Sequence, residues 1–180
     1  MKLNTLNAVL FILISNISFS FATTTPANVP NIPDPILVGE VSISDIEHYK
    51  WYEENFKTYQ PDQDILQSIA TKIANQDIRI EVYFGTWCPD SQREVPRLIK
   101  LLKQLDFNMD KLTLTALDKD KIVPELSKKD AEKLNIKMIP TFVFYHKNKE
   151  INRFVEFARK TLEHDVLSIL SNVGYKHSYK

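Results

Sequence analysis

The feature that most constrains the fold is the stretch FGTWCPDSQREVP, from Phe84 to Pro96, which contains the only cysteine of the chain. The run before it, Ile78–Phe84, is rich in β-branched and aromatic residues and predicts a strand. The run after it, Ser91–Leu105, repeats apolar residues at helical spacing and predicts a helix. Cys88 therefore lies where a strand ends and a helix begins.

This position favours a reactive sulfur. A helix N-terminus offers unpaired backbone N–H groups and the positive end of the helix dipole. Both favour the thiolate over the thiol, and the thiolate is the nucleophile in thiol chemistry. Pro89 suits the first helical turn, where no N–H is needed, and Trp87 can cover the sulfur with a flat apolar surface. We therefore predict that Cys88 is a reactive thiol; the alternative is an inert, half-buried one.

The remaining patterns predict an α/β domain after a helical extension, in the order β-α-β-α-β-β-α. The predicted strands are Ile78–Phe84, Lys111–Leu117, Thr141–His146 and a hairpin partner at Ile151–Phe157. The predicted helices begin at Ser44 or Asp45, at Pro61, at Ser91, near Lys128 and at Thr161, and Gly174 closes the last of them.

The N-terminal residues predict export. Lys2 is followed by an apolar stretch and then by small residues, so residues 1–22 are expected to form a secretory signal peptide that is cut after Ala22. The apolar stretch is short for a membrane span, and an uncleaved anchor is the alternative. We expect a periplasmic or secreted protein without stable membrane insertion after the signal is removed. A lone cysteine in an exported protein indicates intermolecular pairing or a free reactive thiol.

The mature chain is expected to have four segments. A proline-rich linker covers residues 23–43, and an N-terminal helical segment covers residues 44–76 and packs on the domain. The main domain covers residues 77–174, and residues 175–180 form a tail.

Composition argues against several classes of protein. Lys plus Arg and Asp plus Glu each number 23, so the formal net charge is zero, and no basic run predicts a nucleic-acid partner. The histidines are scattered, so we predict no metal site and no cofactor. The four histidines are His48, His146, His164 and His177. No sequence pattern predicts the oligomeric state.

Two separated motifs carry a family resemblance. A strand, then Trp-Cys-x-x-Ser, then a helix, with a later Ile-Pro-Thr that opens a strand, resembles the thioredoxin superfamily and in particular exported thiol–disulfide oxidoreductases with a TWCP motif. The resemblance covers residues 78–171. It implies a thioredoxin-like mixed sheet flanked by helices, with residues 44–76 as an N-terminal helical extension.

The resemblance also implies a substrate groove. In the family, the bond before Pro140 is cis and lies against the cysteine, which leaves the preceding backbone free to pair with an extended substrate. The residues that this implies for substrate binding are Trp87, Pro89, Ile139, Pro140 and Thr141.

Two residues depart from the family pattern. Ser91 stands where a second, resolving cysteine would be, and a hydroxyl cannot attack a mixed disulfide, although it can donate a hydrogen bond to the Cys88 thiolate. Val82 stands where many thioredoxins keep a buried acid, and strand alternation directs Glu81 to the other face of the sheet.

Two functions follow from these patterns. In the first, Cys88 and Ser91 are the catalytic residues of a monothiol enzyme that exchanges with protein or small-molecule thiols and disulfides. Cys88 then forms a mixed disulfide that an external thiol resolves. In the second, the groove of a non-catalytic module binds an extended polypeptide or a partner protein.

Overall fold

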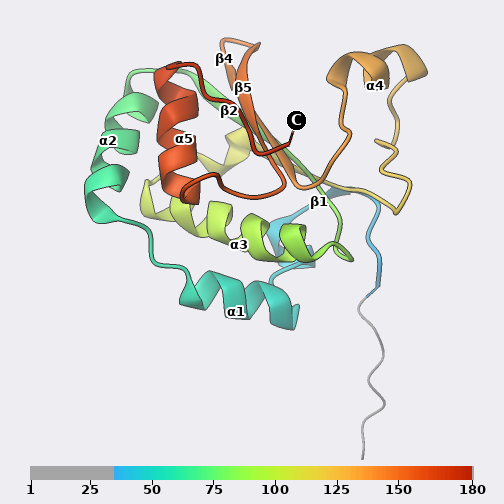
Figure 1. Cartoon of the computed structure of the whole chain (residues 1–180). Coiled ribbons are helices and arrows are strands. Elements are labelled where there is room, and N and C mark those ends of the chain that lie inside the picture. The colour runs from blue at the N-terminus through green and yellow to red at the C-terminus, as the bar shows by residue number, and fades with distance from the viewer. Residues whose placement is uncertain (1–34, 180) are drawn as a thin grey trace, which may run out of the picture. The chain divides into compact units, whose positions relative to one another are not determined.

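The structure is a computed structural model of the whole chain, of which residues 35–179 are described (Figure 1). The predicted signal peptide, residues 1–22, and the first part of the predicted linker lie outside the described residues. The described residues belong to one compact unit. Among them, no helix combines the length and the apolar character that crossing a membrane requires.

The centre of the domain is a five-stranded mixed sheet with the strand order β1-β3-β2-β4-β5. Strand β2 pairs with β3 in parallel and with β4 in antiparallel fashion, and the β1–β3 and β4–β5 pairs are antiparallel. The strands are β1 Gly39–Val41, β2 Ile78–Phe84, β3 Leu112–Ala116, β4 Thr141–His146 and β5 Lys149–Val155.

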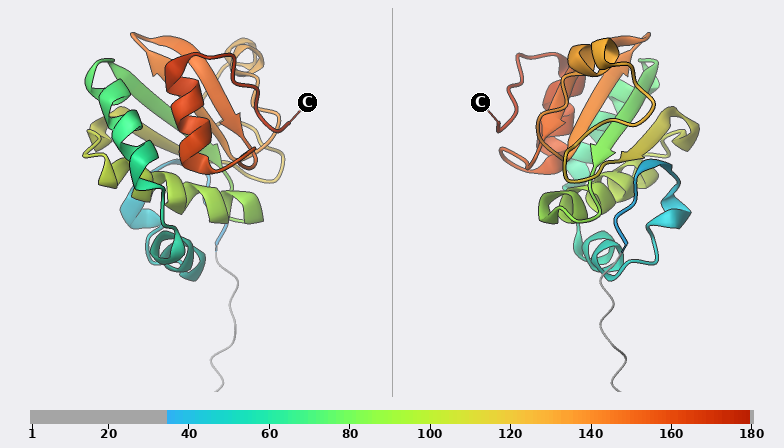
Figure 2. Two further views of the ribbon diagram at one scale, coloured as in Figure 1. Left: turned by 60° about the vertical axis from the view of Figure 1, so that its left-hand side comes forward. Right: turned by 90° about the vertical axis from the view of Figure 1, so that its right-hand side faces the viewer.

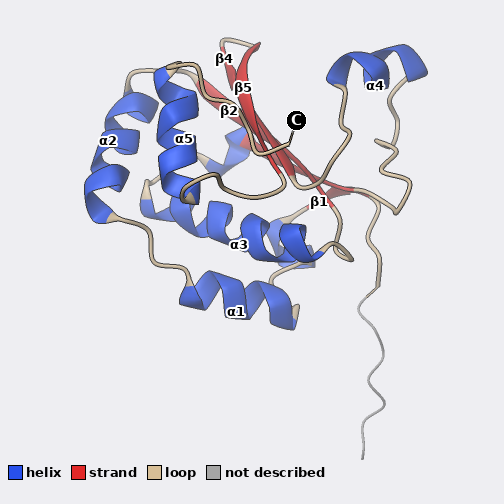
Figure 3. Cartoon of the chain, viewed as in Figure 1, coloured by secondary structure: helices blue, strands red, loops and turns tan. Residues whose placement is uncertain are grey.

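Helices cover both faces of this sheet (Figure 3). Helices α2, α3 and α5 lie on one face, α1 packs on α3, and α4 with its connecting segments lies on the opposite face (Figure 2). The helices are α1 Lys50–Thr58, α2 Gln63–Ala74, α3 Pro89–Gln104, α4 Lys128–Leu134 and α5 Leu162–Ser171, with short 3-10 turns at Ile43–Asp45 and Met109–Lys111. The predicted thioredoxin-like α/β architecture with a helical extension is confirmed.

Side-chain alternation along β2 divides the core. Ile80, Val82 and Phe84 face the main core beneath α2, α3 and α5. Tyr83 faces a smaller cluster on the other side, and this cluster also contains Cys88. In the main core, Phe142 and Phe154 stack across the β4–β5 pair with ring centroids 4.8 Å apart. Burial of these apolar faces is the main force that holds the site elements in place.

Three local features differ from the sequence expectation. Strand β1 lies within the predicted linker. The helix expected from Ser44 or Asp45 begins only at Lys50, because Ser42 and Asp45 form a capping box that closes a single 3-10 turn. Asn172, not Gly174, ends α5, since its φ of 53° places it in the left-handed region that asparagine tolerates.

Candidate active site

Cys88 is the N-cap of α3, directly after the end of β2. Its backbone is extended, with φ −91° and ψ 121°, and Pro89 is the first helical residue. The Cys88 N–H donates to Gly85 O at 3.0 Å, and Cys88 O accepts the first helical hydrogen bond, from Gln92 N, at 2.9 Å. A tight turn thus fixes the sulfur at the positive end of a 16-residue helix.

The second motif meets this sulfur. The Ile139–Pro140 peptide bond is cis, and Cys88 Sγ lies 3.5 Å from Ile139 O, to which it donates. The Pro140 carbonyl accepts from Glu156 N at 2.8 Å, which ties the loop before β4 to the end of β5. Two segments separated by 51 residues therefore converge on one thiol.

The thiol is mostly covered. Cys88 is 9% exposed and belongs to the smaller apolar cluster with Leu117, Val123 and Ile139. Trp87 packs against this cluster, and its Nε1 donates to Leu117 O at 3.0 Å. This hydrogen bond holds the indole across the loop that follows β3.

The other two predicted groove residues differ in accessibility. Pro89 is exposed on the first turn of α3. Thr141 is buried at 2% exposure, and its Oγ1 donates to Met138 O at 2.7 Å, so the hydroxyl braces the loop that contains Pro140. Its side chain therefore shapes the backbone of the groove and does not face solvent.

Ser91 makes a different contact from the predicted one. The side chain is fully buried, and its Oγ accepts a hydrogen bond from Gly85 N at 3.1 Å. Within residues 35–179, no hydrogen bond joins Ser91 Oγ to Cys88 Sγ, so the predicted bond to sulfur is absent. The hydroxyl satisfies a buried backbone donor, which would otherwise be left unpaired at considerable cost. Ser91 thereby fixes the turn that carries the cysteine.

The acid of β2 lies away from the main core, as strand alternation predicts. Glu81 accepts hydrogen bonds from the hydroxyls of Tyr83 and Tyr145, each at 2.9 Å, and pairs with Arg79. Burial raises the pKa of Glu81, but the hydrogen bonds from Arg79 and the two tyrosines outweigh burial and leave this pKa below its usual value. Val82 is fully buried in the main core. The position that many thioredoxins give to an acid thus carries no ionisable group here.

Thr86 is a site residue that the sequence did not single out. Its side chain is 2% exposed, and its Oγ1 donates to Pro35 O at 3.2 Å and accepts from Leu37 N at 3.3 Å. The Thr86 carbonyl accepts from Gln92 Nε2 at 2.6 Å. Thr86 therefore joins the segment before β1 to the cysteine loop. No local pattern indicates this, because the partners are about 50 residues apart.

We expect Thr86→Val to lower the free energy of unfolding by about 1–2 kcal/mol, mainly because Leu37 N–H loses its partner, whereas Pro35 O keeps the Tyr49 hydroxyl at 3.5 Å. Urea denaturation measures the change. Thr113→Val on β3 is the matched control, since within the described residues the Thr113 side chain makes no hydrogen bond, and it should change stability by less than about 0.5 kcal/mol. Equal losses in the two variants would contradict a role for Thr86 as a tether.

The fold and the site together define a thioredoxin-like protein with one thiol at a helix N-terminus beside a cis-proline loop. The family model described as thioredoxin matches residues 42–167, which is more than half of the chain. The chain belongs to the thioredoxin family. A search of curated proteins gave no match.

One solved structure shares the fold, and two others align over just over half of the chain, all at low sequence identity. A protein of unknown function from Pseudomonas aeruginosa aligns over 75% of this chain and 92% of its own, with 16% identity and a TM-score of 0.50. The thioredoxin of Fasciola hepatica covers 53% of this chain and 86% of its own, with 22% identity and a TM-score of 0.36. The germline-specific thioredoxin Deadhead of Drosophila melanogaster covers 57% and 87%, with 18% identity and a TM-score of 0.37.

Proposed function

We propose that this chain is an exported thioredoxin-like protein that takes part in thiol–disulfide exchange through Cys88 alone. The observation that carries the proposal is the convergence of the α3 N-terminus and the Ile139 carbonyl on one sulfur. The loop that contains the cis-proline offers its backbone to an extended substrate.

The exchange has two balanced steps. The Cys88 thiolate attacks one sulfur of a substrate disulfide, a new S–S bond forms to Cys88, and the other substrate sulfur leaves as a thiolate with the electron pair of the broken bond. An external thiolate then attacks the substrate sulfur of the mixed disulfide, a new S–S bond forms between these two sulfurs, and Cys88 leaves as a thiolate. The external thiol is necessary because Ser91 provides no second sulfur. A protein or a small-molecule thiol serves in this step.

We expect the folded protein to form a mixed disulfide with an aromatic disulfide reagent at Cys88 and to release it when a small thiol is added. Intact-mass spectrometry measures both steps, and Cys88→Ser should abolish them. Ser68→Ala is the control, because it removes an exposed hydroxyl from α2, away from the cysteine turn, and should leave both steps intact. The reaction of Cys88 should be faster in the folded protein than in the denaturant-unfolded chain.

A slower reaction in the folded state would contradict the proposal. It would favour the second candidate, a module that binds an extended polypeptide or a partner protein without turnover. The observation behind that candidate is the burial of the site, since Cys88 is 9% exposed and Ser91 is fully buried. In that case Cys88→Ser would leave partner binding unchanged.

A further inference from the structure

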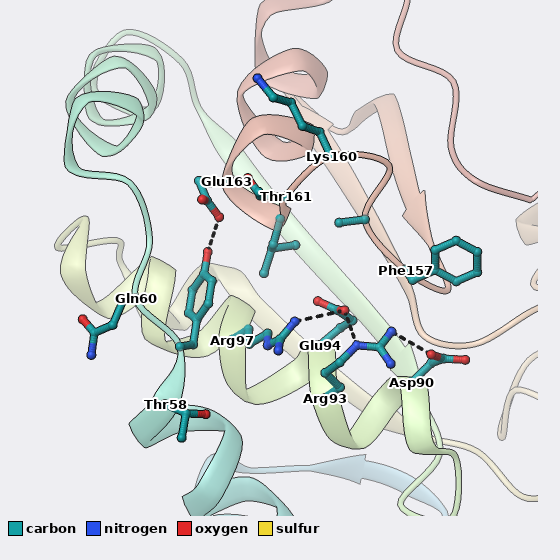
Figure 4. A pocket seen from close by; sticks show the side chains of 13 residues that line it. Thr58, Gln60, Asp90, Arg93, Glu94, Arg97, Phe157, Lys160, Thr161 and Glu163 are labelled. Atoms are coloured by element: carbon teal, nitrogen blue, oxygen red, sulfur yellow. Dashed lines mark hydrogen bonds and ion pairs between the residues drawn. The ribbon is translucent and has the colours of Figure 1, made fainter.

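A polar pocket of about 700 Å³ begins beside the cysteine turn. It is formed by the end of α1, one side of α3, the connection between β5 and α5, and the first turn of α5 (Figure 4). Asp90, on the first turn of α3, lies at one end, and Phe157, which is 47% exposed, lies beside it. The pocket is therefore continuous with the helix turn that carries the thiol.

Glu94 is an unusual lining residue of this pocket. Its side chain is 3% exposed, and one oxygen, Oε1, accepts from Arg93 Nε at 2.7 Å and lies 3.5 Å from an Arg97 nitrogen. The other oxygen, Oε2, is buried without a hydrogen-bond partner among the described residues, and so is Arg97 Nε. Figure 4 shows the Glu94 carboxylate beside the guanidinium groups of Arg93 and Arg97, with both ion pairs made by one oxygen. Two side chains of the pocket lining thus carry one unused acceptor and one unused donor, and both atoms are covered from solvent.

Leaving such groups unpaired is costly, since a buried polar atom without a partner loses the hydrogen bonds that water gave it. Burial also raises the pKa of Glu94, although the Arg93 and Arg97 guanidinium groups act in the opposite direction. A bound group that both donates to Glu94 Oε2 and accepts from Arg97 Nε would remove this cost. Arg97 is 32% exposed, so its side chain can move to admit such a group.

The charges of the pocket indicate that this group is neutral. The lining contains three cations and three anions, and the four charged residues on α3 are paired with one another. A charged ligand would leave the pocket with an uncompensated charge. The charged lining residues are Arg93, Arg97, Lys160, Asp90, Glu94 and Glu163.

We propose that this pocket is a specificity subsite that binds the carboxamide of an asparagine or glutamine side chain in the polypeptide that exchanges with Cys88. A carboxamide is neutral and carries a donor and an acceptor on one carbon, which matches the two unused atoms. This inference rests on the proposed function for its polypeptide substrate, but its binding step requires no redox chemistry.

The position of the carboxamide follows from helix geometry. Glu94 is six residues after Cys88, which is about 9 Å along the axis of α3. An extended chain advances by about 3.3 Å per residue. The carboxamide should therefore be about three residues from the substrate cysteine.

Blocked peptides with one cysteine and a variable residue three positions after or before it test the subsite. The variable residue is glutamine, glutamate, lysine or leucine, and S-methylation of the peptide cysteine prevents exchange. Fluorescence anisotropy with the native chain at neutral pH measures the dissociation constants. In one of the two orientations, we expect glutamine to bind about tenfold more tightly than leucine, a difference of about 1.4 kcal/mol, and more tightly than glutamate or lysine.

Two variants test whether Glu94 causes the preference for the glutamine peptide. Glu94→Gln keeps the shape of the side chain but removes its charge and one acceptor, and it should reduce the glutamine preference to about twofold or less. Lys103→Gln is the control, because it places an amide on the same helix outside the pocket and should leave the preference intact. Circular dichroism checks that both variants fold.

Equal binding of the four peptides in both orientations, or strongest binding of the glutamate or lysine peptide, overturns the inference. Mixed-disulfide formation at Cys88 is measured separately with the small aromatic reagent. If Cys88 reacts but glutamine is not preferred, the proposed exchange function stands and the subsite is refuted. If glutamine is preferred but Cys88 does not react, the subsite stands and the exchange function is refuted.

Discussion

Ser91→Cys is expected to turn the single-thiol site into a dithiol site. The native chain should reduce insulin disulfides only slightly faster than dithiothreitol alone, because each mixed disulfide at Cys88 must wait for an external thiol. The variant should raise the rate by about tenfold or more, since an internal thiolate resolves the intermediate faster than an external one. Insulin precipitation in the presence of dithiothreitol measures the rate.

The local geometry supports this expectation. Residues 88 and 91 are separated by three positions at the start of α3, where side chains on one face have Cβ atoms about 5–6 Å apart. A disulfide requires about 3.5–4.5 Å. Cys88 is the N-cap and has extended backbone angles, so a small rotation there can close the difference. The thiol at position 91 accepts more weakly from Gly85 N–H than the hydroxyl does, which should cost about 1 kcal/mol of stability.

Two controls separate this gain from side effects. Ser91→Ala also loses the contact with Gly85 N–H but adds no sulfur, and it should not exceed the native rate. The double variant Cys88→Ser, Ser91→Cys retains one thiol, fully buried, and should be inactive. Ser91→Cys could form the 88–91 disulfide and still reduce insulin no faster than the native chain. That result would contradict the expectation, because it would show that the chain lacks other parts of the dithiol mechanism besides the second sulfur.

The helices and strands with clear local sequence patterns were predicted accurately. Strands β2 and β4 have the predicted bounds and helix α4 begins at the predicted residue, because compact apolar runs or capped helical stretches are flanked by residues that break the pattern. Strand β1 was missed, since three residues carry no periodicity and this strand exists only through its pairing with β3. The convergence of Cys88 and Pro140 came from the family resemblance and not from local pattern.

Contacts between distant segments explain what the sequence did not reveal. Ser91 was expected to face the sulfur, but its hydroxyl instead satisfies a buried backbone N–H, which a sequence pattern does not show. The contacts of Arg93 are a second example. Arg93 pairs with Asp90 and Glu94, because α1 and α5 place their ends over this side of α3. Such burial of charges depends on tertiary packing.

Gly85→Ala is expected to disrupt the site by displacing the side chains that pack over residue 85. A Cβ at position 85 would lie 2.7 Å from Trp87 Nε1 and 2.9 Å from Ile139 Cδ1, closer than van der Waals contact allows. Both side chains would have to move, and the 3.0 Å hydrogen bond from Trp87 to Leu117 O would be strained or lost. We expect stability to fall by about 2–3 kcal/mol through overpacking and this lost bond. Urea denaturation measures the change.

The same substitution should slow mixed-disulfide formation at Cys88, because Ile139 provides the carbonyl that contacts the sulfur. Gly174→Ala is the matched control: a Cβ there meets open space, and its φ of 72° adds only about 1 kcal/mol of backbone strain. That variant should react at the native rate. Gly85→Ala could destabilise the chain no more than Gly174→Ala and leave the reaction of Cys88 unchanged. That result would show that the close packing of Trp87 and Ile139 over Gly85 does not position the thiol.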